Sequence, residues 1–536
     1  MSSSLVPDRT PGSMSQYSKI NLVSYLLLCL FVISFLVFLN STQPFVLTDI
    51  LGDDVNIGDK VGSLAFADEI VSIVLCPLWG SLSDKVGTRP VSVIGLLILS
   101  TSLFFYTTGN SVYPDLLLLR MFFAVGTSAC VSMIPAILAE LSASYEESKF
   151  DGYRQVEDMN WGDDVSNDEE NDALEAIEER NAYFDDPTVV SRDTPFFEQS
   201  EASPKSYRNA KLAGLVGVVT GIGAVLSVSL FLPLPTWLDR NSGGENDAKI
   251  ALRNSYYIVS AIAFFVSILL FLGLHKDRSK SFRLWLNGGS VSIFDEAALD
   301  TMPDSLPYFQ TIKMGFLAAK DRQVALSYVG GLVARSATVA LTLFVPLAVN
   351  FYFYEQGICK VGDPHDALPD VKKGCHEAYV LAAILTGIAN TVSLVFAPIW
   401  GLLGDYIGQH GSLMVSALVG FTGCIGFAFV EKPNSPVSFV MACFLGAGQI
   451  GAIVLSMSMC TNSRRQYNGS ISGVYSLSGG LGILLITKVG GYISDIWKGA
   501  PFVILAGFYF LLCIAIIWAL PKGESKGFSR LFSPPR

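Results

Sequence analysis

Long apolar runs that are almost free of charged residues recur along the chain, separated by mostly short polar connections. Each run has about the 20 residues that an α-helix needs to cross a bilayer. Helices are expected because a backbone in lipid must pair its own amides and carbonyls. We therefore predict an all-α membrane protein with twelve transmembrane helices, at residues 21–46, 61–82, 91–109, 114–138, 211–233, 254–274, 323–349, 378–403, 411–430, 436–459, 468–488 and 500–520.

A thirteen-residue polar turn follows the second apolar run and has a second copy later in the chain. The first copy, PLWGSLSDKVGTR, begins at Pro77, and the second, PIWGLLGDYIGQH, begins at Pro398. Six positions coincide between the copies: Pro77/Pro398, Trp79/Trp400, Gly80/Gly401, Leu82/Leu403, Asp84/Asp405 and Gly87/Gly408. The repeat predicts two related, pseudo-symmetric six-helix halves, at residues 21–274 and 323–520.

Lysine and arginine in the connections predict how the helices are oriented. Lys85 and Arg89 follow the second span and Arg464 and Arg465 follow the tenth, whereas the first connection is mainly acidic. Since basic residues favour the cytoplasmic side, we expect the even-numbered connections there. The N-terminal tail (1–20), the linker between the halves (275–322) and the C-terminal tail (521–536) are then cytoplasmic. Within the linker, residues 290–299 could lie on the membrane surface.

Composition agrees with this pattern and locates the charge. Of the 536 residues, 51% are hydrophobic and 15% are charged, which is too apolar for a water-soluble enzyme of this size. The net charge is -11, and residues 146–208 alone hold 19 acidic and 6 basic residues. This acidic insert (142–210) cannot bury a core, so we expect disorder. It is either a solvated run or a regulatory or docking segment, and residues 171–182 could form a transient helix.

The first turn resembles the signature loop of the major facilitator superfamily. The positions that fit are Gly80, Leu82, Ser83, Asp84, Lys85, Gly87 and Arg89, whereas Thr88 stands where a basic residue is usual. Pro90 makes the loop most similar to the fungal-type drug:proton-antiporter branch. The resemblance implies the two-half facilitator fold. It also implies that Asp84 contacts the N-terminus of the eleventh helix, which would begin near Asn468. Gly401, Asp405 and Gly408 would form the corresponding loop of the second half.

Two further residues fit the family and one segment does not. An arginine early in the fourth helix is matched by Arg120, and an acidic residue that pairs with the signature loop is matched by Glu140. Arg89 is the partner we expect for Glu140. The fifth helix lacks the proline of the antiporter pattern, which leaves the direction of transport open.

Four charged residues are predicted to lie at similar depth inside the membrane: Asp68, Glu69, Arg120 and Arg335. Because adjacent residues point about 100° apart on a helix, one carboxylate could face Arg120 and the other Arg335. Such residues usually mark a substrate or proton path, although a static ion-pair network is the alternative. The second half has Asn390 at the repeat position of Glu69, so the expected site is asymmetric.

Cysteine and histidine do not suggest a metal site. Seven cysteines are scattered singly in apolar runs, and the four histidines lie in connections without zinc-ligand spacing. Cys359 and Cys375 share a polar loop on the predicted outer side, where a disulfide could form. Two unpaired thiols are the alternative.

These features favour a secondary active transporter, not an enzyme, that moves a small organic solute by alternating access with proton coupling. A facilitative uniporter of an amino acid, nucleoside or sugar, and a transporter-like receptor or regulator, are the alternatives. We expect a monomer in the lipid bilayer of a eukaryotic vacuolar or plasma membrane. The expected partners are the solute and protons, with no cofactor and no nucleic acid.

Overall fold

The structure is a computed structural model of the chain, and it describes residues 19–52, 57–160, 209–239, 245–274, 307–356, 376–461, 467–494 and 497–520. The regular secondary structure of these residues is helical throughout. Twelve of the helical segments are long and apolar enough to cross a membrane, which confirms the predicted all-α, twelve-span fold. The chain separates into two units, Met1–Gln16 with Ala143–Pro204, and Tyr17–Ser142 with Lys205–Arg536. All twelve spans lie in the second unit.

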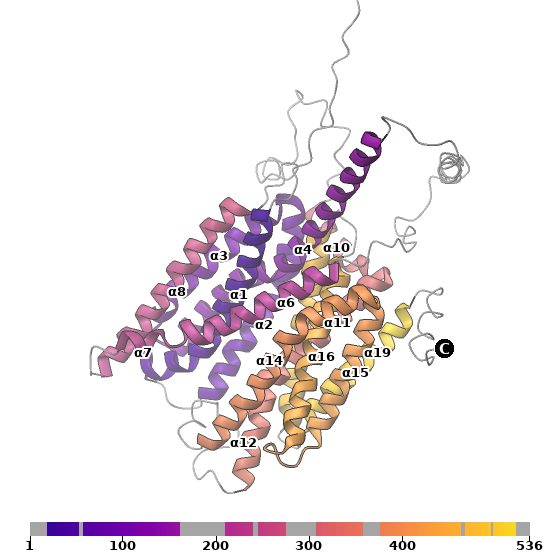
Figure 1. Cartoon of the computed structure of the whole chain (residues 1–536). Helices are drawn as coiled ribbons and strands as arrows, with labels where there is room; N and C mark the ends of the chain where they lie inside the picture. Colours follow the sequence, from indigo (N-terminus) through magenta and orange to yellow (C-terminus); the bar gives the residue numbers. More distant parts are fainter. Residues whose placement is uncertain are drawn as a thin grey trace, which may run out of the picture. The chain divides into compact units, whose positions relative to one another are not determined.

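The first half holds six spans, several of which end in a π-helical or 3-10 turn. Its elements are α1 (Lys19–Phe45) with η1 (Val46–Ile50), α2 (Ile57–Val86), α3 (Thr88–Phe105) with η2 (Tyr106–Thr108), η3 (Val112–Leu116) with α4 (Leu117–Asn160), α6 (Asn209–Leu226) with η5 (Ser227–Phe231), the short α7 (Leu234–Asp239), and α8 (Glu245–Gly273). Helices α3 and α8 pack together, and α1 packs against α6 and α8 (Figure 1).

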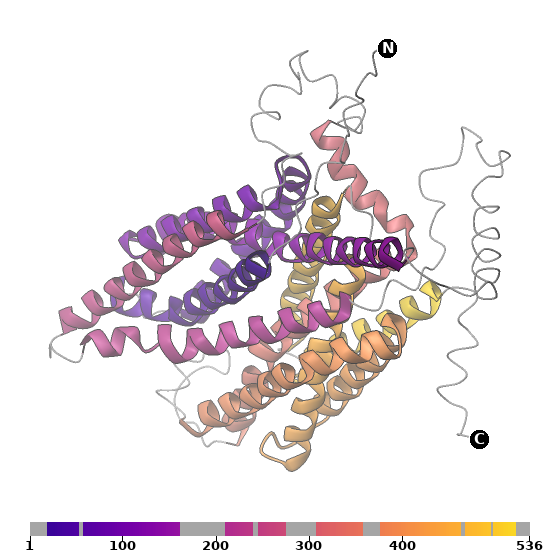
Figure 2. The ribbon, with the colours of Figure 1, turned by 45° about the horizontal axis from the view of Figure 1, so that its top comes forward.

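The second half repeats this order after a short linker helix. Its elements are α10 (Tyr308–Leu317) with η7 (Ala318–Lys320), α11 (Arg322–Val339) with η8 (Ala340–Phe344) and α12 (Val345–Glu355), α14 (His376–Tyr406), α15 (Gln409–Ala428), α16 (Pro436–Thr461), α17 (Asn468–Leu485) with η9 (Ile486–Gly490) and α18 (Gly491–Ser494), and α19 (Ala500–Ala519). Helices α14, α15, α16 and α19 pack as neighbours (Figure 2).

The two copies of the repeated turn have the same backbone conformation. Gly87 precedes α3 with φ 92° and ψ 158°, and Gly408 precedes α15 with φ 96° and ψ 152°. A residue with a Cβ resists this positive φ, whereas glycine adopts it without steric cost. The repeat seen in the sequence is therefore a repeat in structure. We call the end of the helices that carries these turns the motif end, and the opposite end the far end.

The halves meet where α2 packs against α17 and where α6 packs against α14 and α16. The pairs α2–α17 and α6–α14 are related by the repeat, because α2 and α14 each end within a copy of the repeated motif. At the motif end, α10 also packs against both α2 and α17.

Two helix ends differ clearly from the predicted ones, and the linker contains a helix. Helix α4 continues to Asn160, into the segment expected to be disordered, because residues 143–160 contain no proline and one glycine. Helix α8 begins well before the predicted residue 254. Lys249 donates a hydrogen bond to the Ile50 carbonyl (2.8 Å) and Arg253 to the Tyr257 hydroxyl (2.7 Å), so its basic residues have partners. Helix α10 was not predicted.

Several expectations concern residues outside the described ranges. These are the conformation of residues 161–208, with the possible helix at 171–182, the surface segment at 290–299, the two tails, and Arg464 and Arg465.

Candidate functional site

Arg120 is the centre of a buried polar cluster in the first half. It lies early in α4 and is only 1% exposed. Its Nε donates to Asp68 Oδ2 of α2 (2.6 Å), its Nη1 to Gln43 Oε1 (2.6 Å) and its Nη2 to Asn40 Oδ1 (2.5 Å), the last two on α1. An arginine inside a membrane costs several kcal/mol unless it is paired. Asp68 supplies the compensating charge, so three helices of this half are tied together.

Glu69, the neighbour of Asp68, faces the other half. A Cβ placed on Gly480 of α17 would lie 2.7 Å from Glu69 Oε1, and one placed on Gly479 would lie 2.7 Å from Arg335 Cγ. Adjacent glycines of α17 thus leave room for Glu69 from α2 and Arg335 from α11. The two charges interact electrostatically, but the structure, which describes both residues, shows no ion pair between them. Asp68 and Glu69 therefore face different partners, one in each half.

A neutral polar group lies near Arg335 in the second half. Gln449 of α16 is 7% exposed and its Nε2 donates to Thr338 Oγ1 (2.9 Å), one turn after Arg335 on α11. Among the described residues, Gln449 Oε1 has no hydrogen-bond partner. Asn390, the repeat counterpart of Glu69, is exposed on α14 and lies in neither cluster.

Asp84 connects the halves at the motif end. Its Oδ1 accepts a hydrogen bond from the Gly469 amide (2.7 Å), and its Oδ2 accepts from the amide and hydroxyl of Ser470 (2.8 and 2.5 Å). These groups lie in the first turn of α17, where free amides and the helix dipole favour an anion. Burial and then the negative charge of Asp84 raise the pKa of Tyr467, the residue before α17. Asp84 therefore lies where the family resemblance places it.

Small residues let α2 and α17 approach closely beside Asp84. A Cβ on Gly80 would overlap the Gly469 carbonyl oxygen, and one on Gly473 would lie 2.5 Å from the Cys76 carbonyl oxygen. The hydroxyls of Ser81 and Ser470 are 3.2 Å apart.

The second copy of the turn makes a related but different contact. A Cβ on Gly401 of α14 would lie 2.7 Å from the Ala210 carbonyl oxygen of α6, so glycine is again needed for close approach. Asp405 lies opposite the start of α6, but the group that faces it is the Lys211 ammonium, 3.8 Å from Asp405 Oδ2. The two contacts are therefore chemically unequal.

The expected pairing of Arg89 with Glu140 is wrong. Thr88 Oγ1 donates to Glu140 Oε2 (2.9 Å), whereas the Arg89 guanidinium lies over the Phe271 ring, 4.5 Å from its centroid. The reason is geometric, because Thr88 and Arg89 are adjacent on α3 and point about 100° apart. Thr88, the residue that departs from the family pattern, thus makes the contact. Lys85 lies in the last turn of α2.

The structure describes only some of the residues that the cysteine and metal predictions concern. Cys359 and Cys375 lie outside the described residues, so their disulfide stays a prediction. No group of three or more potential metal ligands occurs among the residues that the structure describes.

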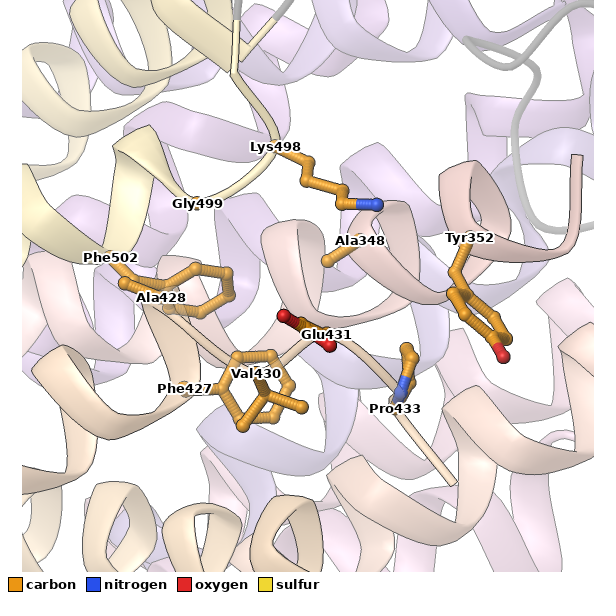
Figure 3. A pocket seen from close by; sticks show the side chains of 10 residues that line it. All are labelled: Ala348, Tyr352, Phe427, Ala428, Val430, Glu431, Pro433, Lys498, Gly499 and Phe502. Atoms are coloured by element: carbon orange, nitrogen blue, oxygen red, sulfur yellow. The ribbon is translucent and has the colours of Figure 1, made fainter. Parts of the chain in front are cut away.

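A small pocket lies at the far end of the second half, away from the charges described above. Its lining includes Tyr352 of α12, Phe427 of α15 and Glu431 after it, and Lys498 before α19 and Phe502 within it (Figure 3). Lys498 donates to Glu355 (2.7 Å). Neither Asp68, Glu69, Arg120 nor Arg335 lines this pocket.

Sequence reasoning missed the amide side chains of the site, Asn40, Gln43 and Gln449. Asn40 and Gln43 begin and end the polar run NSTQ near the end of α1, and Gln449 is a single polar residue in an apolar stretch of α16. The spacing of Asn40 and Gln43 by three residues, which places them on one face of the helix, was the available signal.

Comparison with known proteins agrees with this architecture. Magnetosome protein MamH of Paramagnetospirillum magneticum is 25% identical over 212 residues, which are 39% of this chain and 46% of that protein. The chain spans less than half the length of the curated relatives it matches first.

Two solved structures resemble the chain over nearly its whole length. The proton:xylose symporter XylE has a TM-score of 0.57 at 14% identity and covers 94% of this chain and 95% of its own. The E. coli fucose:proton symporter FucP has a TM-score of 0.59 at 13% identity, with 94% and 100% covered. At such identities the likeness shows the fold alone. The family model described as Major Facilitator Superfamily matches residues 26–152 and 200–487, so the chain belongs to this superfamily of transporters.

Proposed function

We propose that the chain is a secondary active transporter that moves a small organic solute by alternating access and couples this movement to protons. One observation carries the proposal: Glu69 of the first half lies beside Arg335 of the second, at the contact between α2 and α17. A titratable group shared by two halves that rock against each other can link its protonation to their movement.

The charges suggest how this link would work. Ionised Glu69 attracts Arg335 and favours the arrangement in which the halves are close at this depth. Protonation removes the negative charge, which frees Arg335 and lets α2 and α17 separate at the far end. Asp68 is already engaged by Arg120, so Glu69 is the better candidate for the coupling residue.

The motif end supports alternating access. Asp84 holds the first turn of α17 closed against α2, and the release of this contact would open the motif end. From the basic residues of the connections we propose that this end and both termini face the cytoplasm. A vacuolar or plasma membrane of a eukaryotic cell and a monomeric state complete the proposal.

The relatives support coupling only by analogy. XylE and FucP are both named as proton symporters. The signature loop is most similar to the drug:proton-antiporter branch, but α6 lacks the antiporter proline. The proposal therefore leaves open whether the solute and the proton move in the same direction.

Proton flux in proteoliposomes tests the proposal. The full chain is reconstituted with an internal pH dye, and xylose, fucose and a series of organic acids, amides and quaternary amines are added in turn. We expect at least one solute to drive proton movement, faster as the pH at the far end falls, because Glu69 must be protonated. Glu69→Gln should abolish this pH dependence, and Asp68→Asn should reduce flux by about tenfold or more, since it leaves Arg120 unpaired.

Glu355→Gln is the matched control, because it makes the same change in an exposed ion pair with Lys498. Its flux and pH profile should equal those of the wild type. If both site variants also keep the wild-type profile, proton coupling is wrong and a uniporter is favoured. Binding of a solute without any flux would instead indicate a receptor.

A further inference from the structure

Arg335 has hydrogen-bonding capacity that the protein does not use. It lies in the middle of α11, half-buried, and a guanidinium carries five N–H donors. The structure describes Arg335 and its surroundings but shows no hydrogen bond or ion pair from its guanidinium. Arg120, by contrast, bonds to three side chains. An arginine at this depth is costly without a partner.

A second unused group lies beside it. Gln449 Oε1 is buried and has no hydrogen-bond partner within the described part of the chain, while its Nε2 is bonded to Thr338. Thr338 follows Arg335 by three residues, so both lie on one face of α11. The two unused groups, a cationic donor and a neutral acceptor, are thus linked through one turn of a single helix.

We propose that Arg335 binds the carboxylate of the transported solute and that Gln449 Oε1 accepts a hydrogen bond from its hydroxyl or amino group. The solute class is then a small carboxylate with a neighbouring donor, such as a 2-hydroxy or 2-amino acid. A guanidinium and a carboxylate form a bidentate, charge-assisted pair. The Gln449 acceptor, about one helical turn away, would bind the hydroxyl or amino group of the same solute. This inference rests on the proposed transport function.

Glu69 is the competitor of such a solute, because both carboxylates require Arg335. The other charged or titratable groups around Glu69 are Asp68 and Cys76 on its own helix, Arg335 on α11, and Tyr475 on α17. Arg120 neutralises Asp68, and Lys488 of η9 lies over Phe66, one turn before Glu69. When a proton neutralises Glu69, the carboxylate of the solute can therefore take its place as the negative charge beside Arg335. The structure assigns electroneutral co-transport, in which one proton and one carboxylate move together.

Binding to the full chain in lipid nanodiscs tests the assignment. The probes are lactate, malate, glycine and glutamate, together with lactamide and glycinamide as amides that lack the carboxylate. At least one carboxylate should raise the thermal stability of the wild type, whereas its amide should not. Arg335→Gln should weaken that binding by about 10- to 100-fold, the value of a charge-assisted hydrogen bond. Arg335→Lys, which keeps the charge without the bidentate geometry, should fall between the two.

Arg322→Gln is the matched control, since it makes the same change on the same helix where Arg322 lies over Trp518. It should bind like the wild type. Gln449→Leu should weaken the hydroxy or amino acid by about tenfold but leave acetate, which lacks the donor, unchanged. In proteoliposomes, uptake of the bound carboxylate should not respond to an imposed membrane potential.

The outcomes separate the two proposals. If xylose, fucose or a quaternary amine drives proton flux and no carboxylate binds, the solute class is wrong and the transport function stands. If a carboxylate binds in an Arg335-dependent manner without flux of any probe, the site is supported and transport is wrong. Equal binding by wild type and Arg335→Gln would overturn the role of Arg335.

Discussion

At the residue scale, Asp84 is the clearest link between sequence and function. It accepts three hydrogen bonds from the first turn of α17, whereas its repeat counterpart Asp405 lies 3.8 Å from the half-exposed Lys211. Hydrogen bonds from helix-terminal amides to a carboxylate are stronger than an exposed ion pair. The hydrogen bonds of Asp84 therefore hold α2 against the start of α17 at the motif end.

We predict that Asp84→Asn opens the motif end more often. The amide has one acceptor oxygen in place of two and no charge for the dipole of α17, a loss of about 1–2 kcal/mol. A cysteine in place of the buried Ser472 of α17 should then react with a polar maleimide about 5 to 30 times faster.

Asp321→Asn provides the control for this experiment. Asp321 caps α11 through the Gln323 amide (2.9 Å), a contact within one half. The Asp321→Asn variant should leave the rate of maleimide labelling at position 472 unchanged. An equal rate in Asp84→Asn and the wild type would show that the contact does not hold the motif end closed.

Thr88 gives a second prediction at this scale. Its hydrogen bond to the Glu140 carboxylate joins α3 to α4, and Thr88→Val removes the donor while keeping the shape. We expect a loss of about 1–3 kcal/mol, since the acceptor is charged. Thr88→Ser should keep most of the stability. Thermal unfolding of the purified chain measures both, and an unchanged midpoint in Thr88→Val would contradict the role.

The sequence predicted part of this residue-level picture. The position of Asp84 against the start of α17 followed from a recognisable motif and a polar break before Asn468. The partner of Glu140 did not, because two adjacent residues of α3 were both plausible and only the rotation of the helix decides between them. Gln449 is an isolated amide, which carries no spacing to interpret, whereas the spacing of Asn40 and Gln43 indicates a shared helix face but not their partner.

At the element scale, the contact surface between α2 and α17, which we call the seam, depends on glycine residues. A Cβ at Gly80 or Gly473 would overlap or crowd the backbone of the opposite helix, so neither position tolerates a larger residue when the helices are in contact. Close backbone approach of this kind stabilises helix pairs in membranes, where no hydrophobic effect drives association.

We predict that Gly80→Leu prevents closure of the motif end without preventing folding. The leucine can be accommodated only when α2 and α17 are apart, so flux should fall by at least about tenfold while insertion and yield stay normal. Gly62→Ala on the same helix is the control, since nothing lies within 4 Å of its Cβ. Wild-type flux in Gly80→Leu would exclude closure at this seam as a required step.

The elements themselves were largely predictable, because a twelve-fold alternation of apolar runs and polar connections is a strong signal. The ends of the helices were less predictable. Helix α8 extends past the apolar run because its basic residues reach backbone and aromatic partners. Helix α10 is ten residues long, which is too short for the pattern of a span. Its position is set by contacts that the sequence does not indicate, such as the hydrogen bond that the Tyr308 hydroxyl donates to the Leu78 carbonyl (2.7 Å).

At the scale of the whole molecule, the contacts between the halves are unevenly distributed. On α14, a Cβ at Gly401 or Gly404 would meet α6 near the motif end, whereas nothing lies within 4 Å of a Cβ at Gly387, nearer the far end. The α2–α17 seam continues from Asp84 as far as Phe66 and Lys488. The two repeat-related seams thus differ in length, and the motif end is where both are in contact.

Alternating access requires these contacts to break in every cycle, which a cross-link can test. The Ser81 and Ser470 hydroxyls are 3.2 Å apart across the halves, close enough for a disulfide once both are cysteine. In a chain whose native cysteines are replaced by alanine, Ser81→Cys with Ser470→Cys should lose flux on oxidation and regain it with reductant. Ser100→Cys with Ser260→Cys is the matched pair, since those hydroxyls are 3.4 Å apart on α3 and α8 of one half. It should cross-link with no loss of flux, because each half moves as a unit. Undiminished flux in the oxidised Ser81/Ser470 variant would mean that transport does not need the motif end to open.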